Sequence, residues 1–158
     1  MFDQINGLPV HVLVLHAAVV FVPLLAVGAV VYALIPRWRS RTGWALVLLA
    51  IAAPAAAFVA KASGTELYER LLGQGLSGPG LEILNDHMSF GTRTAWFSLA
   101  LGVVSLVMVA LTWRRAGTRL PLVGELGGAV VLIVLAAFAG YYVFQTGDSG
   151  ANAVWGTY

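Results

Sequence analysis

Four long apolar runs, separated by short polar segments, dominate the pattern of this chain. They cover roughly residues 8–34, 43–60, 94–113 and 122–144. Each is close to the ~20 apolar residues that a helix needs to cross the hydrocarbon core of a bilayer. A soluble domain of 158 residues rarely contains four such runs. The pattern therefore predicts an all-α integral membrane protein, with residues 1–158 forming a single bundle of four transmembrane helices.

The longest polar segment lies between the second and third runs. Residues 65–72 place apolar side chains at positions 67, 71 and 72 with polar ones between, which indicates a short amphipathic helix. Glycine and proline in residues 73–80 interrupt this pattern, and a second short helix is expected from Leu81 into the third run. The segment is therefore predicted to be a short helical loop and not a separate domain.

Charge is distributed unequally among the connections. The segments after the first and third runs, with the start of the fourth, carry six arginines against one acid, Glu125. The other connections carry three basic and six acidic residues. Basic loops stay in the cytoplasm, so both termini and the 62–92 loop are predicted on the outer face of a bacterial cytoplasmic membrane. Glu125 falls in the first turn of the fourth helix, where we expect it to pair with Arg115 or Arg119.

Composition excludes several kinds of function. With no cysteine, the chain has no thiolate for metal binding, iron–sulfur ligation or catalysis. The net charge of +2 is spread over short loops, which argues against nucleic acid binding. Ionisable residues are missing from the middle of the runs, which argues against an ion pathway. No nucleophile elbow or phosphate-binding loop is present, so we do not expect an enzyme.

Three histidines and one carboxylate are expected together at the outer ends of the helices. His16 precedes Arg37 by 21 residues, or ~31 Å of helix, which places it at the outer boundary of the hydrocarbon, with His11 ~7.5 Å further out. His87 lies before the third run, and Asp148 follows the fourth. Because imidazole is a common metal ligand and helix bundles often carry such sites, this clustering predicts a metal or haem site.

Two ligand sets are open for such a site. A haem b would need axial histidines from different helices, which selects His16 and His87. A divalent metal ion could use His16, His87 and Asp148, with His11 as an outer ligand. Alternatively, the histidines bond to loop backbone and Asp148 caps a turn. The protein would then be an accessory or assembly subunit of a membrane redox complex, or a homo-oligomer, without its own cofactor.

Three segments resemble a bacterial membrane-protein family of unknown function, domain of unknown function 2231. Residues 7–17, with His11 and His16, resemble its first helix, which typically has a His-Pro pair and a second histidine five residues after the first. Residues 85–91, around His87, resemble its entry to the third helix. Residues 146–155 resemble its C-terminal signature, commonly Thr-Gly-His-Ser-Gly-Ala followed by a tryptophan. The resemblance covers essentially the whole chain.

Two positions depart from that family pattern. Val12 replaces the usual proline, and Asp148 replaces the usual histidine. If the family histidine is a ligand, Asp148 offers a carboxylate in its place, which favours a hard or borderline metal over a low-spin haem. The resemblance implies no established activity, although some relatives are joined to redox domains, which favours electron-transfer chemistry.

Overall fold

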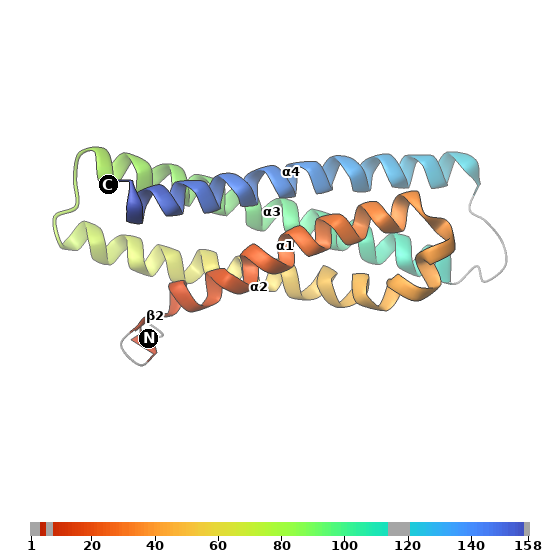
Figure 1. Cartoon of the computed structure of the whole chain (residues 1–158), viewed down its shortest axis with the longest axis horizontal. Helices are drawn as coiled ribbons and strands as arrows, with labels where there is room; N and C mark the ends of the chain where they lie inside the picture. Colours follow the sequence, from red (N-terminus) through yellow and green to blue (C-terminus); the bar gives the residue numbers. More distant parts are fainter. Residues whose placement is uncertain (1–3, 6–7, 114–120, 157–158) are drawn as a thin grey trace.

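The chain folds into four long helices in a computed structural model that describes residues 4–5, 8–113 and 121–156 (Figure 1). The helices are α1 (Val10–Leu34), α2 (Arg39–Gly73), α3 (Pro79–Trp113) and α4 (Leu122–Trp155). A short 3-10 helix, η1 (Pro36–Trp38), joins α1 to α2, and two two-residue strands, β1 (Gln4–Ile5) and β2 (Leu8–Pro9), pair antiparallel before α1. All four α-helices contain a stretch long and apolar enough to cross a membrane. The predicted all-α fold with four spans is confirmed.

The helices run up and down around a ring. Each helix packs against the next in the sequence and α4 packs back on α1, whereas α1 and α3 make few contacts because they lie diagonally across the bundle (Figure 1). The start of α1, the α2–α3 connection and the end of α4 lie at one end, which we call the histidine end. The opposite end carries Arg37, Arg39 and Arg41, and we call it the arginine end.

The helices α2, α3 and α4 are longer than the apolar runs from which they were predicted. The 35 residues of α2 correspond to ~52 Å of helix, well beyond a hydrocarbon core of ~30 Å. Within the segment 62–92, residues 62–73 and 79–92 are helical. The helix expected from Leu81 into the third run is confirmed as the start of α3, whereas the helix expected at 65–72 is continuous with α2 instead of separate. Residues 147–150, which one interpretation of the sequence treats as a turn capped by Asp148, are also helical and belong to α4. Polar side chains are compatible with helix here because the outer turns of α3 and α4 pack against each other.

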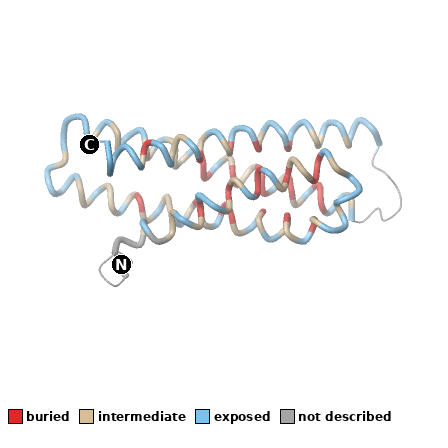
Figure 2. The backbone as a smooth tube through the Cα atoms, viewed as in Figure 1, coloured by how far each residue is buried: buried red, intermediate tan, exposed pale blue. Residues whose placement is uncertain are grey.

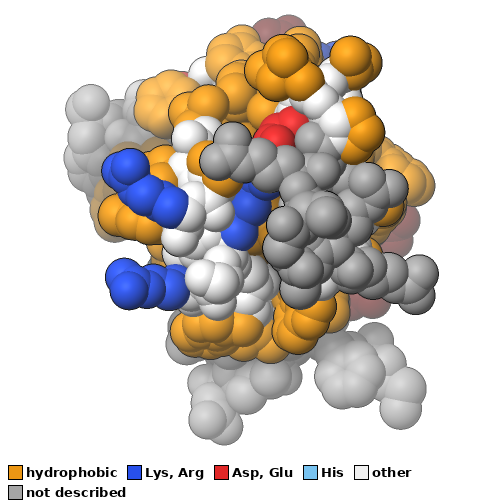
Figure 3. All heavy atoms as spheres, turned by 90° about the vertical axis from the view of Figure 1, so that its right-hand side faces the viewer, with side chains coloured by type: hydrophobic (Ala, Val, Ile, Leu, Met, Phe, Trp, Pro, Cys, Tyr) orange, Lys and Arg blue, Asp and Glu red, His pale blue; other side chains and the backbone are white. Residues whose placement is uncertain are grey.

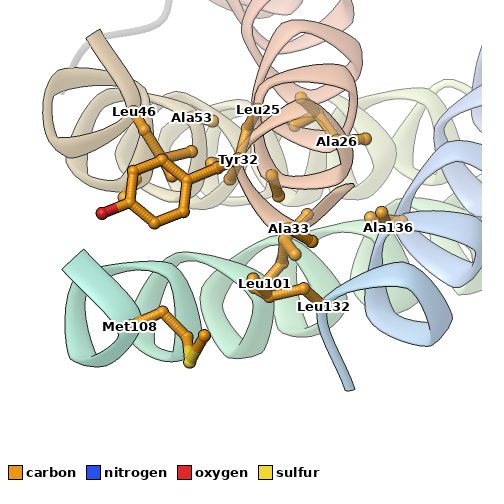
Figure 4. Packing of buried hydrophobic residues seen from close by; sticks show 14 of the residues in the cluster. Leu25, Ala26, Tyr32, Ala33, Leu46, Ala53, Leu101, Met108, Leu132 and Ala136 are labelled. Carbon is orange, nitrogen blue, oxygen red and sulfur yellow. The ribbon is translucent and has the colours of Figure 1, made fainter. Parts of the chain in front are cut away.

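The core is built from one leucine of each helix, surrounded by small residues. Leu25, Leu46, Leu101 and Leu132 are at most 2% exposed. Alanines pack between them, including Ala26, Ala33, Ala53 and Ala136 (Figure 4). Figure 2 shows the buried positions on the inward faces of the helices, mostly in the middle of the bundle. Small side chains let helix backbones approach closely, as is common in membrane bundles.

An ion pair closes the arginine end. Arg39 Nη1 lies 2.8 Å from Glu125 Oε1, and the same guanidinium donates to the backbone carbonyls of Tyr32 and Ala33 at 2.9 and 3.3 Å. Those carbonyls belong to the last turn of α1, where helix oxygens have no partner within the helix. Glu125 therefore has a structural role with Arg39 as a described partner; Arg115 and Arg119, the partners expected from the sequence, lie outside the described residues. Figure 3 views this end, where basic side chains project next to apolar ones.

Candidate functional site

His11, in the first turns of α1, turns its ring toward α2. Its Nδ1 lies 2.9 Å from the carbonyl oxygen of Ala60 and 3.3 Å from Ser63 Oγ. A carbonyl oxygen can only accept a hydrogen bond, so Nδ1 is the donor and carries the hydrogen of the ring. In the uncharged ring, the lone pair available to a ligand is therefore on Nε2.

His87, on α3, has the same kind of environment from α4. Its Nδ1 lies 3.0 Å from the carbonyl oxygen of Thr146 and 3.2 Å from Ser149 Oγ. The hydrogen of the neutral ring is again on Nδ1, and the free lone pair is on Nε2. The hydroxyl of Thr146 bonds to Thr94 at 2.9 Å. This second contact ties the same turn of α4 to α3 and fixes the position of the carbonyl that His87 uses.

The two imidazoles meet across the bundle. The ring centroids of His11 and His87 lie 6.2 Å apart and the ring planes are perpendicular. Their helices, α1 and α3, are diagonal, so the contact lies between α2 and α4, at the centre of the histidine end. Both side chains are only partly exposed. The structure thus brings together two histidines that are 76 residues apart in the sequence (87 − 11).

Burial affects the protonation of His11. Five residues, or ~7.5 Å of helix, separate it from His16, so it lies outside the predicted hydrocarbon boundary. Loss of solvent lowers the pKa of the His11 imidazole below its ordinary value of 6.5, and the bond to the Ala60 carbonyl only partly opposes this. The ring is therefore neutral at pH 7, which is the form that binds metal ions.

His16 and Asp148 have different surroundings. His16 is exposed, and its Nδ1 lies 2.7 Å from the carbonyl of Val12 in its own helix. Asp148 is exposed as well and accepts a 3.3 Å hydrogen bond from Asn152 Nδ2, one turn further along α4. Within the described residues, no group of three or more histidine, aspartate or glutamate side chains is placed to hold a metal ion. The described contacts join His87 to His11, and none joins it to His16 or Asp148.

Asp148 instead lines a groove between α3 and α4. The groove has a volume of about 340 Å³, and Asp86, Phe90 and Gln145 also line it. Ser149, which bonds to His87 on one side, contributes to the same groove. The groove therefore brings the acidic outer surface of α3 and α4 close to the histidine pair.

Sequence reasoning alone did not identify the residues that hold the rings. Ser63 and Ser149 are each followed by glycine, and each Ser-Gly pair lies on a helix facing one of the paired histidines. A recurring Ser-Gly dipeptide is the available signal, but it is weak. A third pair, Ser77-Gly78, lies in the α2–α3 connection, where Gly78 has a φ of 69°.

Comparison with known proteins gives one match. A family model described as "Predicted membrane protein (DUF2231)" covers residues 7–157. The chain belongs to this family. The searches of curated proteins and of solved structures returned no match.

In this DUF2231 protein, the segments that resemble the family build the histidine end. Residues 7–17 contain His11, residues 85–91 contain His87, and residues 146–155 contain Thr146 and Ser149, which bond to His87. The replacement of the usual histidine by Asp148 falls on an exposed side chain one position before Ser149. It leaves the His11–His87 contact in place.

Proposed function

We propose that this DUF2231 protein binds one transition-metal ion between the Nε2 atoms of His11 and His87, either as a bare ion or as the iron of a haem. The contact between the two rings is the observation that carries the proposal. His11 takes the place that the sequence analysis gave to His16. The sequence-based prediction that His16 and Asp148 are ligands is the alternative to this proposal, and the variants below distinguish the two.

The tautomer of both rings supports this proposal. Metal-binding histidines commonly donate one ring N–H to a carbonyl or carboxylate, which orients the ring and leaves the other nitrogen for the metal. His11 and His87 both have this arrangement, with backbone carbonyls at 2.9 and 3.0 Å from Nδ1. In the neutral rings, both Nε2 lone pairs are then available to a metal ion without loss of a proton.

The separation of the rings supports it too. With both Nε2 atoms turned toward a shared ion, two metal–nitrogen bonds of ~2 Å each would separate these atoms by ~4 Å. The distance from each nitrogen to the centre of its own ring would then make up the remainder of the 6.2 Å between centroids. The centroid spacing is the one that such an arrangement requires, which supports the proposal. Imidazole suits zinc, copper, iron and nickel, in contrast to calcium and magnesium, which prefer oxygen ligands.

A role in electron transfer is the use that we favour for such a centre. A copper ion or haem iron held by two imidazoles can change its oxidation state without a change of ligands. Its position at one end of a membrane-spanning bundle would place the electron at one surface of the bilayer. This also accommodates the proposed association with a membrane redox complex.

Metal content and absorption of the purified protein test the proposal. We expect about one metal ion per chain after loading with Cu⁺, Zn²⁺ or Co²⁺, or a Soret band if the ion belongs to a haem. His11→Ala and His87→Ala should each lose the metal or the Soret band, and His16→Ala, the matched control on α1, should retain it. Asp148→Asn should retain it as well.

Other results would contradict the proposal in different ways. Protein that contains no metal or haem, and takes up none on loading, would leave the accessory-subunit alternative. Loss of binding in His16→Ala together with retention in His11→Ala would return the site to His16 and His87.

A further inference from the structure

The two halves of the bundle hold their histidines in the same way. In the first half, His11 on α1 rests against Ala60, Ser63 and Gly64 of α2; we call these three residues the first clamp. In the second half, His87 on α3 rests against Thr146, Ser149 and Gly150 of α4, the second clamp. Each clamp has the same spacing: a carbonyl, then a serine three residues later, then a glycine.

The serine hydroxyls make the same bonds in both clamps. Ser63 Oγ donates to its own helix, at 3.0 Å from the Val59 carbonyl and 3.1 Å from that of Ala60. Ser149 Oγ does the same toward Gln145 and Thr146, at 2.8 and 3.2 Å. A hydroxyl has one hydrogen, so each serine that donates to its helix can only accept from the histidine. Serine and carbonyl thus both require a hydrogen on Nδ1.

The glycines make room for the rings. A Cβ atom at Gly64 would lie 3.1 Å from Cε1 of His11, and one at Gly150 would lie 3.0 Å from Cε1 of His87. The next nearest atom in both cases is Nδ1, at 3.2 and 3.3 Å. Separations this short require the ring to shift by a few tenths of an ångström, because atoms in a packed interior normally stay in van der Waals contact at larger distances. Each glycine therefore leaves room for the ring in the position from which its Nδ1 reaches the carbonyl.

From this correspondence we infer that the two clamps are matching positioning devices, which fix His11 and His87 as Nδ1–H tautomers and present both Nε2 atoms to one common cation. The two ring centroids lie 6.2 Å apart, so one ion that bonds to both unprotonated Nε2 atoms would join the two halves of the bundle. Neither clamp supplies a carboxylate, so the ligand class is a metal that bonds well to neutral nitrogen, such as copper or zinc, and not a hard cation such as Ca²⁺ or Mg²⁺.

The purpose assigned to the clamps rests on the proposed function, but their effect on the tautomer does not. The tautomer can be measured in metal-free protein, so the two ideas can fail separately. If the clamps fix the tautomer and no metal binds, the inference about positioning stands and the proposed function falls. If metal binds but the tautomer is different, the proposed metal binding stands and the inference about positioning falls.

Nitrogen NMR of metal-free protein in detergent, labelled with ¹⁵N-histidine, tests the inference. His11→Gln, His16→Gln and His87→Gln assign the signals at a pH where the rings are neutral. We expect the Nδ1 of His11 and His87 in the protonated, pyrrole-type range and their Nε2 in the unprotonated, pyridine-type range. Gly64→Ala should shift the signals of His11 without changing those of His87. Gly150→Ala should shift the signals of His87 without changing those of His11.

Matched controls are available on the same helices. Gly73→Ala on α2 and Gly147→Ala on α4 add a Cβ that meets nothing within 4 Å, so neither should move the histidine signals. With Cu⁺ or Zn²⁺ as the probe, each clamp variant should weaken binding by about tenfold or more, as is typical when the partner of a metal-binding histidine is lost, and the controls should not. Protonated Nε2 in both neutral rings of the wild type, or clamp variants with unchanged tautomers, would overturn the inference.

Discussion

Each paired histidine is defined by what its Nδ1 contacts. His11 and His87 bond to carbonyls of neighbouring helices, whereas exposed His16 bonds within its own helix. A bond to another helix fixes the ring relative to the whole bundle, but a bond four residues back along the same helix does not. Identical side chains in one chain therefore have different capacities to hold a ligand in a defined place.

The protonation of His11 predicts a pH dependence of stability. Its pKa is lowered in the folded protein by burial, while a histidine in the unfolded chain titrates near 6.5. Below that pH the unfolded state binds more protons than the folded state, so this contribution to stability is present above about pH 6.5 and is lost as the pH falls. Unfolding in detergent at pH 7.5 and pH 5 should show this loss. His11→Gln should reduce the difference between the two pH values, and an undiminished difference would contradict the assignment to His11.

At the scale of helices, α2 and α3 lie close together at Gly102. An added Cβ would lie 2.5 Å from the carbonyl oxygen of Ala50, which is backbone and cannot turn away. The same stretch of α3 contains fully buried Leu101. The two helices can therefore lie this close at position 102 only because the residue there has no side chain.

Gly102→Ala should destabilise the bundle by about 1–3 kcal/mol, because the two helices must move apart and the core around Leu101 must repack. Gly140→Ala on α4 is the matched control, since its Cβ would meet nothing within 4 Å. Thermal or SDS-induced unfolding in mixed micelles measures both variants. Equal stability of the two variants would show that the α2–α3 contact tolerates a methyl group and that the spacing is not fixed there.

At the scale of the whole molecule, the two ends of the bundle differ in chemistry. The arginine end carries Arg37, Arg39 and Arg41, and the histidine end carries the imidazole pair and the groove with Asp86 and Asp148. Positive charge is retained on the cytoplasmic side of membranes. The proposed metal site is accordingly predicted to face the outside.

Reporter fusions test this orientation. Alkaline phosphatase fused to the C-terminus, or inserted in the α2–α3 connection at Gly75, should be active because both places lie at the histidine end, which we predict to be outside. A fluorescent protein that folds only in the cytoplasm should be dark at the C-terminus. Insertion of the phosphatase after Arg37 is the matched control and should be inactive. The opposite set of activities would place the histidine end in the cytoplasm.

The sequence was sufficient for the fold because membrane insertion depends on properties that are local in the chain. An apolar run is visible without knowledge of its neighbours, and Pro36 and Pro121 mark the places where α1 has ended and α4 begins. The lengths of α2, α3 and α4 were underestimated, since their outer turns are polar and are helical through contacts with one another. The sequence also placed the histidines at one end, which follows from counting helix turns.

Tertiary structure decided which of those histidines meet. His11 and His16 are five residues apart, which turns their side chains about 140° from each other on a helix, so only one of them can face the centre of the bundle. Which one does so depends on the rotation of α1 against α2 and on the register of α3 against α4, and neither is encoded by any single segment. The same holds for the clamps. In the sequence, Gly64 and Gly150 do not differ from other small residues, and their role is visible only in the structure, where a histidine ring from another helix lies against each of them. Hydrophobic pattern and charge therefore determined what crosses the membrane, and packing between helices determined where its chemistry lies.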